Sequence, residues 1–316
     1  MESYESKSPV LFLVFNRPDV TARVFEAIRR AKPSRLYVAC DGPRDERVGE
    51  GVKVATVREI VTQIDWDCEL KTLFREGNLG CRKAVSEAIT WFFGNEELGI
   101  ILEDDCLPVE SFFPYMDEAL TKYADDSSIG CVTGYIASNS LVSDNSCILS
   151  RYNHCWGWGS WRDSWLNYND QIENWPVLRE SDWLLSVGQG DHTFASYWTR
   201  IFDRLYEGEF DSWAYRWTFA CWKEGTLTVL PGNNMIENLG FNSDATHTKR
   251  CSFHYPQTID TEIIVDFGAA KFASFHRDKW IGKNHFGHTW FRQTIKYPLI
   301  RSAKKIVNRL FKKRRI

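Results

Sequence analysis

Short apolar runs alternate with amphipathic segments over the first hundred residues, and this alternation limits the folds open to the chain. The apolar runs predict strands at 10–15, 36–40, 69–74 and 99–102, and the segments between them predict helices at 19–31, 52–64 and 83–93. Strands that alternate with helices at this spacing form βαβ units, which build a parallel sheet with helices on its faces. We therefore predict an α/β fold with a mostly parallel central sheet.

The regular pattern ends near residue 134. The next hundred residues are rich in Trp, Gly and Asn and show little periodicity. We predict three parts: a βαβ half at 1–134, a substrate-shaping half at 135–294 that continues the same sheet, and a basic tail at 295–316 that is helical beyond Pro298.

The net charge of −3 hides an uneven distribution. Residues 301–316 carry eight Lys or Arg and no acid, so the other 300 residues carry 31 basic and 42 acidic side chains, a net charge of −11. A nucleic-acid-binding domain carries its positive charge on the fold itself. The sequence therefore predicts no nucleic-acid partner.

Cysteine usage and the N-terminal segment bear on the compartment. The nine cysteines are an odd number and include no CxxC pair, which argues against a disulfide framework and a zinc site. The apolar run at 10–15 is too short to cross a bilayer, and the residues before it are polar. These features predict reduced thiols and a cytoplasmic location.

Polar residues follow all four predicted strands. They are Asn16-Arg17, Asp41-Gly42, Arg75 and Glu103-Asp104-Asp105. Ligands of open α/β sheets bind at the carboxyl ends of the strands, so these residues mark the predicted site. No strand end carries the G-x-G-x-x-G or P-loop pattern, so a dinucleotide or ATP cradle lacks its basic feature.

Three consecutive acids at one strand end, Glu103, Asp104 and Asp105, predict a cation among them, because they repel one another. Hard oxygen ligands suit Mg²⁺ or Mn²⁺, and such ions are usually held by one or two carboxylates together with substrate phosphates. A diphosphate leaving group needs that counter-charge. The alternative is a solvated acidic turn that caps a helix at Glu110.

Six segments in a fixed order resemble a known family: NRP, CDGPR, GNLGC, ILEDDCLP, WGWGSWR and NLGFNSDATHT. Over roughly residues 8–250 the chain resembles GT-A glycosyltransferases, in particular a bacterial group of nucleotide-diphospho-sugar transferases. It is more distantly similar to the animal N-acetylglucosaminyltransferase I family, which carries EDD at the same place. The resemblance implies a Rossmann-like GT-A fold and inverting transfer of a hexosyl or N-acetylhexosaminyl group from a nucleotide-diphosphate donor, UDP-type favoured, to a saccharide.

The resemblance also implies roles for the residues at the strand ends. Arg17 and Asp41 would bind the nucleotide, Asp104 the ribose and Glu103 the donor sugar nucleotide. Asp105 would ligate Mn²⁺ or Mg²⁺. Alternatively, Arg17 and Asp41 form a structural salt bridge with each other.

Two further groups could reach the donor. The helix that follows Asn78 points its amide dipole at the predicted site, where Arg82 or Lys83 could help to hold the donor; alternatively, Asn78 is only the N-cap of that helix. His247 lies in a polar loop and would approach the metal or the diphosphate, as late histidines often do in GT-A enzymes. A structural role for His247 is the alternative.

The general base and the acceptor site fall in the second half. An inverting transfer needs a carboxylate that takes the proton from the acceptor hydroxyl. The segment at 210–217 resembles the one that supplies this base in the animal family, so Asp211 is the predicted base and Glu237 its substitute; the alternative for Asp211 is a helix N-cap. Trp156 and Trp158 alternate with glycines and would stack on the acceptor sugar, or else form a tight turn packed into the core.

The tail predicts a peripheral membrane contact. On a helix its apolar residues gather on one side of the eight cations: Ile300, Ile306, Val307, Leu310 and Phe311. A basic amphipathic helix is typical of an anchor on an anionic surface, here the inner face of the plasma membrane. A lipid-linked saccharide acceptor, as in bacterial surface polysaccharide or glycolipid assembly, would suit that placement. A solvated terminus is the alternative.

Two other classes share parts of this pattern. A sugar-phosphate nucleotidyltransferase has a similar sheet and a metal, but it usually carries a Gly-rich loop with Arg or Lys after the first strand, and FNRPD is not such a loop. A non-catalytic carbohydrate-binding protein would account for the 14 tryptophans but not for acids at a strand end. The products of donor turnover separate the three classes.

Overall fold

The computed structural model describes residues 4–142, 145–240, 256–265 and 273–288. By its internal contacts the chain forms two compact units. One consists of Met1–Asp170 and Asp211–Ser274, and the other of Gln171–Phe210 and Phe275–Ile316. The predicted residues His247 and 295–316 lie outside the described residues, so the structure does not test the predictions made for them.

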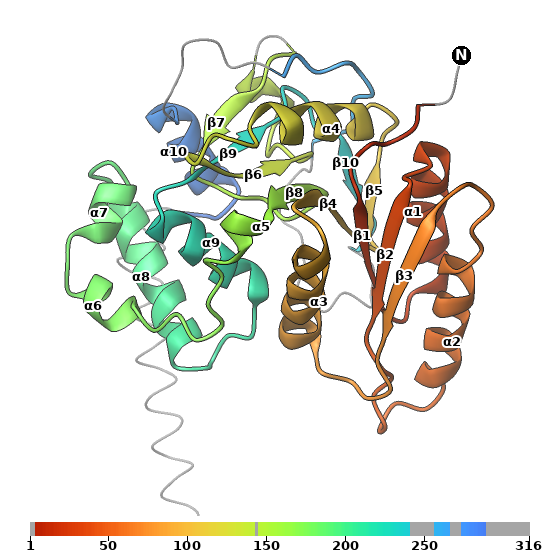
Figure 1. Ribbon diagram of the computed structural model, residues 1–316. Coiled ribbons are helices and arrows are strands. Elements are labelled where there is room, and N and C mark those ends of the chain that lie inside the picture. The colour runs from red at the N-terminus through yellow and green to blue at the C-terminus, as the bar shows by residue number, and fades with distance from the viewer. Residues whose placement is uncertain (1–3, 143–144, 241–255, 266–272, 289–316) are drawn as a thin grey trace, which may run out of the picture. The chain divides into compact units, whose positions relative to one another are not determined.

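The first unit is built on an eight-stranded sheet with the order β3-β2-β1-β4-β8-β6-β9-β7 (Figure 1). Its strands are β1 (Val10–Val14), β2 (Arg35–Cys40), β3 (Glu69–Phe74), β4 (Leu98–Glu103), β6 (Ile129–Thr133), β7 (Ile148–Ser150), β8 (Trp158–Trp161) and β9 (Leu227–Leu230). Strands β1 to β4 pair in parallel, and β8 and β7 run against the other six. This confirms the predicted α/β class with a mostly parallel central sheet.

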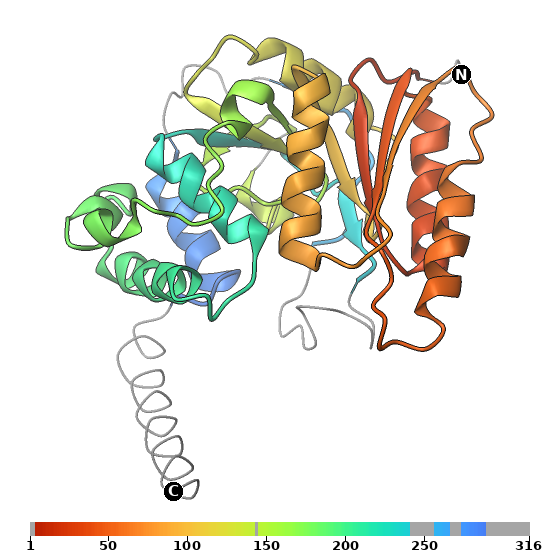
Figure 2. The ribbon, with the colours of Figure 1, turned by 60° about the horizontal axis from the view of Figure 1, so that its bottom comes forward.

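Helices cover both faces of this sheet. Figure 2 shows α1 (Pro18–Ala31) and α2 (Glu50–Val61) on one side of β1, β2 and β3, and α3 (Cys81–Asn95) on the other. All five residues of β1 are buried, and alternate side chains point to opposite faces of the sheet. Val10, Phe12 and Val14 pack in the core that also contains Val24 and Ile28 of α1. The flanked sheet is Rossmann-like, and its first four strands and first three helices lie where the apolar pattern predicts them.

The middle of the sheet contains a strand that the sequence pattern did not predict. Strand β8 lies antiparallel between β4 and β6, and all four of its residues are buried. A Cβ atom at Gly159 would lie 2.9 Å from the carbonyl oxygen of Gly99 and 2.7 Å from Cε of Met116. The glycine of this aromatic segment therefore serves close packing inside the sheet.

A two-stranded antiparallel ribbon leaves the carboxyl end of β4. It pairs β5 (Cys106–Pro108) with β10 (Ile236–Asn238). The first unit also contains α4 (Phe112–Lys122), α5 (Arg162–Trp165), α9 (Trp213–Lys223) and the short 3-10 helix η1 (Asn139–Leu141). Because β10 pairs with the residues that directly follow Asp105, it brings the segment near residue 240 to the predicted site.

The second unit is helical where it is described. It comprises α6 (Trp175–Arg179), α7 (Trp183–Val187), α8 (His192–Tyr206) and α10 (Phe275–Asn284). Trp175 packs edge-on against Phe202 of α8, with ring centroids 5.3 Å apart. Ring contacts among Trp175, Trp183 and Phe202 give the unit its own aromatic core. The division of the chain into halves at residue 134 stays a prediction. Among the described helices, none is both long enough and apolar enough to cross a membrane.

Candidate functional site

The centre of the predicted site is an ion-pair cluster at the carboxyl ends of β1 and β4. Arg17 Nη2 donates to Oδ1 of Asp104, and Arg17 Nε donates to Oδ2 of Asp104 at 3.2 Å. Arg17 Nη1 donates to Oδ2 of Asp105 at 2.9 Å. Because β1 and β4 are adjacent and parallel, residues 87 and 88 positions apart in sequence meet here. The structure thus brings three predicted site residues together.

Glu103 completes the acidic cluster. Its side chain is half-buried, and within the described residues it forms no ion pair. Burial raises the pKa of Glu103, and the neighbouring carboxylates of Asp105 and Asp104 raise it further, whereas Arg17 lowers it. Burial also raises the pKa of Asp104, against the opposing effect of Arg17. The cluster is therefore not the solvated acidic turn considered above, and α4 begins at Phe112 with Ser111, not Glu110, as its N-cap.

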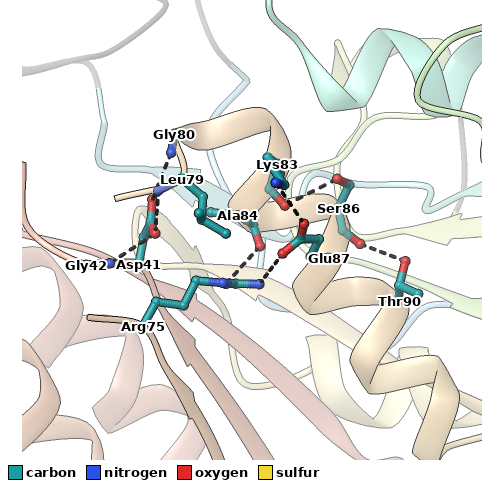
Figure 3. Close-up of polar contacts among 10 residues, drawn as sticks. All are labelled: Asp41, Gly42, Arg75, Leu79, Gly80, Lys83, Ala84, Ser86, Glu87 and Thr90. Atoms are coloured by element: carbon teal, nitrogen blue, oxygen red, sulfur yellow. Dashed lines mark hydrogen bonds and ion pairs between the residues drawn. The ribbon is translucent and has the colours of Figure 1, made fainter. Parts of the chain in front are cut away.

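Asp41, at the end of β2, binds the backbone that leads into α3. Its Oδ1 accepts hydrogen bonds from the amides of Gly42 and Leu79, each at 3.0 Å, and its Oδ2 accepts from Leu79 and Gly80, each at 3.1 Å (Figure 3). Arg17 pairs with the acids of β4, so the alternative salt bridge between Arg17 and Asp41 is not present. Asp41 thus links the end of β2 to the backbone at the start of α3.

The junction between β2 and α3 is tightly packed. Asn78 Nδ2 donates to the carbonyl oxygen of Gly42 at 2.8 Å, and Gly80 is the N-cap of α3. The alternative in which Asn78 caps the helix is therefore wrong. A Cβ atom at Gly42 would lie 2.5 Å from the carbonyl oxygen of Glu76, which only a glycine avoids. Lys83 lies 3.7 Å from Glu87 on the next turn of α3.

Arg82 binds two acids that are far apart in sequence. Its Nη1 contacts Asp170 and its Nε contacts Asp211, whose side chain is 65% exposed. Ser212 caps α9 by accepting from the amide of Tyr215, so the alternative N-cap role for Asp211 is wrong. The predicted donor-binding arginine and the predicted base are therefore partners of each other, and Asp170 joins them.

Cys81, the first residue of α3, feels the charges of both the acidic cluster and Asp211. Burial raises the pKa of Cys81 to about 12, and the charges of Glu103, Asp211 and Asp105 raise it as well.

Glu237 and the residues after it approach the site from the ribbon. Glu237 is 56% exposed and lies 3.7 Å from Arg23 Nη2. The amide of Leu239 donates to the carbonyl oxygen of Asp105 at 2.7 Å, and a Cβ atom at Gly240 would lie 2.2 Å from Asp105 Oδ2. The chain thus passes directly beside the Asp105 carboxylate just before residues 241–255, which include His247.

The two tryptophans predicted to stack on an acceptor differ in the structure. Trp158 is fully buried, and its ring packs against Trp165, Trp213 and Trp217. The prediction that Trp158 offers a face to a sugar is therefore wrong, because β8 carries it into the core. Trp156 is partly exposed and packs edge-on against Tyr135, with ring centroids 4.6 Å apart.

Two residues of the site escaped the sequence analysis. Asp170 lies in an aromatic stretch with no periodicity, and no local pattern marks it as the partner of Arg82. Gly240 stands in the NLGF segment, where a glycine before a polar loop could have indicated a close backbone approach. Both contacts join parts of the chain more than 80 residues apart.

Divalent cations fit the chemistry of this cluster only with further ligands. Within the described residues, no group of three or more His, Cys, Asp or Glu side chains is arranged to hold a metal ion. Mg²⁺ and Mn²⁺ sites often use one or two carboxylates plus substrate phosphates, and Asp105 offers carboxylate oxygens of this hard kind. A metal ion at this cluster therefore stays a prediction.

The matches between this chain and known proteins are distant. No protein-family model matches the chain, and no curated protein does. Among solved structures, a 4-diphosphocytidyl-2C-methyl-D-erythritol synthase from Anaerococcus prevotii is 12% identical, with a TM-score of 0.34 over 54% of this chain and 77% of that one. An apo UDP-glucose pyrophosphorylase is 7% identical, with a TM-score of 0.32 over 72% of this chain and 91% of that one. Similarity this low assigns no activity.

Proposed function

We propose that the chain is a glycosyltransferase that moves a sugar from a nucleotide-diphosphate donor, UDP-type favoured, to a saccharide or lipid-linked saccharide. The observation that carries this proposal is the meeting of Arg17 with Asp104 and Asp105 at the carboxyl ends of adjacent parallel strands. In an open α/β sheet this is the edge where ligands bind. A buried acid pair with one guanidinium at that edge suits a phosphate-bearing ligand that arrives with a cation.

The donor would lie between β4 and the start of α3. Arg17 and Asp41 would bind the nucleotide and Asp104 would contact the ribose, as the motif resemblance suggests. Asp105, joined by His247, would ligate Mn²⁺ or Mg²⁺, which neutralises the charge that develops on the departing diphosphate. Glu103 is the remaining acid near the donor sugar.

The transfer step needs one base. The acceptor hydroxyl oxygen bonds to the anomeric carbon while the bond from that carbon to the diphosphate oxygen breaks, and the hydroxyl proton passes to a carboxylate. Asp211 is exposed and is oriented by Arg82, which favours it as that base. Glu237 on β10 is the second choice. A single base and direct displacement give inversion at the anomeric carbon.

Product analysis tests the proposal. The full chain is incubated with UDP- and GDP-sugars, Mn²⁺ and a saccharide panel, and the released phosphates are identified. Release of nucleoside diphosphate supports glycosyl transfer, whereas pyrophosphate indicates a nucleotidyltransferase. Donor binding without turnover across the panel indicates a carbohydrate- or nucleotide-binding protein.

The Asp105 carboxylate gives the sharper test of the metal. Asp105→Ala should abolish Mn²⁺-dependent donor binding in a thermal-shift titration, because the ion loses its protein oxygen ligands. Asp67→Ala, at an exposed acid between α2 and β3, is the control and should bind like the wild type. Unchanged Mn²⁺ dependence in Asp105→Ala would show that the metal assignment is wrong.

A further inference from the structure

We propose that Arg17 is the resident cation of the Asp104–Asp105 pair, and that a divalent cation binds Asp105 only after the Arg17 guanidinium has been displaced. This rests on the proposed function only in taking Asp105 as the metal ligand. The proposal adds a competition, which we call the gate: in the donor-free protein the Arg17 guanidinium occupies the position that the metal ion would take.

The guanidinium makes more contacts with the acids than a surface ion pair does. Three of its nitrogens contact three carboxylate oxygens, two on Asp104 and one on Asp105. The side chains of Asp104 and Asp105 are only 5% and 18% exposed, and that of Arg17 is 27% exposed. A planar guanidinium that contacts two largely buried carboxylates forms strong charge-assisted hydrogen bonds, so displacing it carries a substantial cost in free energy.

The local backbone explains why Arg17 can hold this position and also leave it. Arg17 is the N-cap of α1, its carbonyl oxygen accepts the amide of Thr21 at 2.9 Å, and Pro18 fixes the first helical position. The main chain is therefore anchored while the long side chain remains a rotatable arm. The guanidinium can swing away from the acids without any change in β1 or α1.

A metal ion and the guanidinium require the same atom. Asp105 Oδ2 accepts from Arg17 Nη1 at 2.9 Å, and the same oxygen lies 2.2 Å from the place where a Cβ atom at Gly240 would stand. Because Gly240 has no side chain, its backbone packs directly against this oxygen, which is therefore covered by both Gly240 and the Arg17 guanidinium. Two cations on one carboxylate oxygen repel each other strongly, so binding of the metal and pairing with Arg17 exclude one another.

A nucleotide diphosphate resolves this competition. It brings phosphate oxygens that complete the coordination of the ion, and it offers the released guanidinium a new bidentate acceptor. The apparent affinity of the protein for Mn²⁺ should therefore be low without nucleotide and rise when UDP is present, and Arg17 should set the size of this rise.

A Mn²⁺ titration of the full chain without donor tests the gate directly. Calorimetry or the spectrum of free Mn²⁺ gives the dissociation constant for the wild type, Arg17→Gln, Arg17→Lys and the double variant Arg17→Gln/Asp105→Asn. Arg17→Gln should bind Mn²⁺ about 10- to 100-fold more tightly than the wild type, the usual weight of one charged hydrogen bond. The double variant should lose this gain. Equal affinities of wild type and Arg17→Gln, whether tight or weak, would overturn the proposal.

Arg17→Gln could fail to fold, because it removes the cation beside two largely buried acids. Arg17→Lys keeps a positive charge there and serves as the second variant. An ammonium group cannot contact both carboxylates as the planar fork does, so this variant should bind Mn²⁺ more tightly than the wild type. Wild-type affinity in a folded Arg17→Lys would contradict the gate. The titration needs no turnover, so a chain that fails every transferase assay could still confirm the gate, and an active transferase could still refute it.

Discussion

Asp211 combines an exposed carboxylate with the guanidinium of Arg82, which orients it, and a general base needs such an arrangement. Asp211→Asn removes the proton acceptor and keeps the shape of the side chain. We expect donor affinity to be retained and kcat to fall by about 10²–10⁴-fold. Steady-state kinetics and a donor titration measure the two effects.

Glu237→Gln serves as the matched control for Asp211→Asn. Glu237 lies 3.7 Å from Arg23 and is similarly exposed, so its variant should turn over near the wild-type rate. If Glu237→Gln loses turnover and Asp211→Asn does not, the base is Glu237. A product with retained anomeric configuration would contradict the single-base mechanism for both residues.

Glu50 is a residue whose ion pair links stability to pH. It accepts from Arg44 and from Asn16 Nδ2, the latter at 2.8 Å, and Arg44 is the main cause that lowers the pKa of Glu50 to about 2. A folded-state pKa below the unfolded value means that the contribution is complete above pH 4.5 and is lost as pH falls toward 2. Urea unfolding from pH 6 to pH 3 should therefore show a shallower pH dependence for Glu50→Gln than for the wild type. Parallel curves would contradict this prediction.

At the scale of elements, the end of β2 and the start of α3 form one packed junction around Gly42. Gly42→Ala would place a Cβ atom 2.5 Å from the carbonyl oxygen of Glu76, and backbone cannot yield as a side chain can. We expect a loss of about 1–3 kcal/mol in the free energy of unfolding, and weaker donor binding, because Asp41 and the start of α3 shift with the junction. Urea unfolding and a donor titration provide the measurements.

Gly51→Ala is the control for this change. Gly51 is the second residue of α2, and no atom lies within 4 Å of the position of its Cβ. Alanine has the higher helix propensity, so this variant should be as stable as the wild type or more stable by up to about 1 kcal/mol. Equal losses in both variants would show that packing at Gly42 has no special role.

At the scale of the whole molecule, charge separates the C-terminal residues from the rest of the chain. Eight Lys or Arg stand in residues 301–316, against a net charge of −11 in the other 300. Each basic residue near an anionic leaflet contributes about 1 kcal/mol of attraction. Deletion of 301–316 should abolish salt-sensitive binding to anionic liposomes in a flotation assay and preserve turnover on a soluble acceptor.

A charge variant separates attraction from mere length. Replacement of Lys312, Lys313, Arg314 and Arg315 by Gln keeps the tail and removes half of its charge, so liposome binding should weaken and lose part of its salt dependence. Equal binding by the wild type, the deletion and the Gln variant would refute the membrane contact.

The sequence by itself determined the first four strands, the helices between them and the polar residues at the strand ends. Hydrophobic periodicity is a local property, and a strand such as β1 is buried wherever it lies in a parallel sheet. The acids of β4 had to reach the ligand-binding edge for the same reason. The roles of His247 and of the tail stay predictions.

Only the tertiary structure decided which charges meet and which aromatic rings are buried. Arg17 could have paired with Asp41, 24 positions away, yet the adjacency of β1 and β4 gives it Asp104 and Asp105 instead. Arg82 meets Asp170 and Asp211 because the chain returns to α3 after the second unit, and Trp158 is buried because β8 enters the sheet between β4 and β6. Such contacts depend on strand order and on long-range packing, which no local pattern of residues encodes.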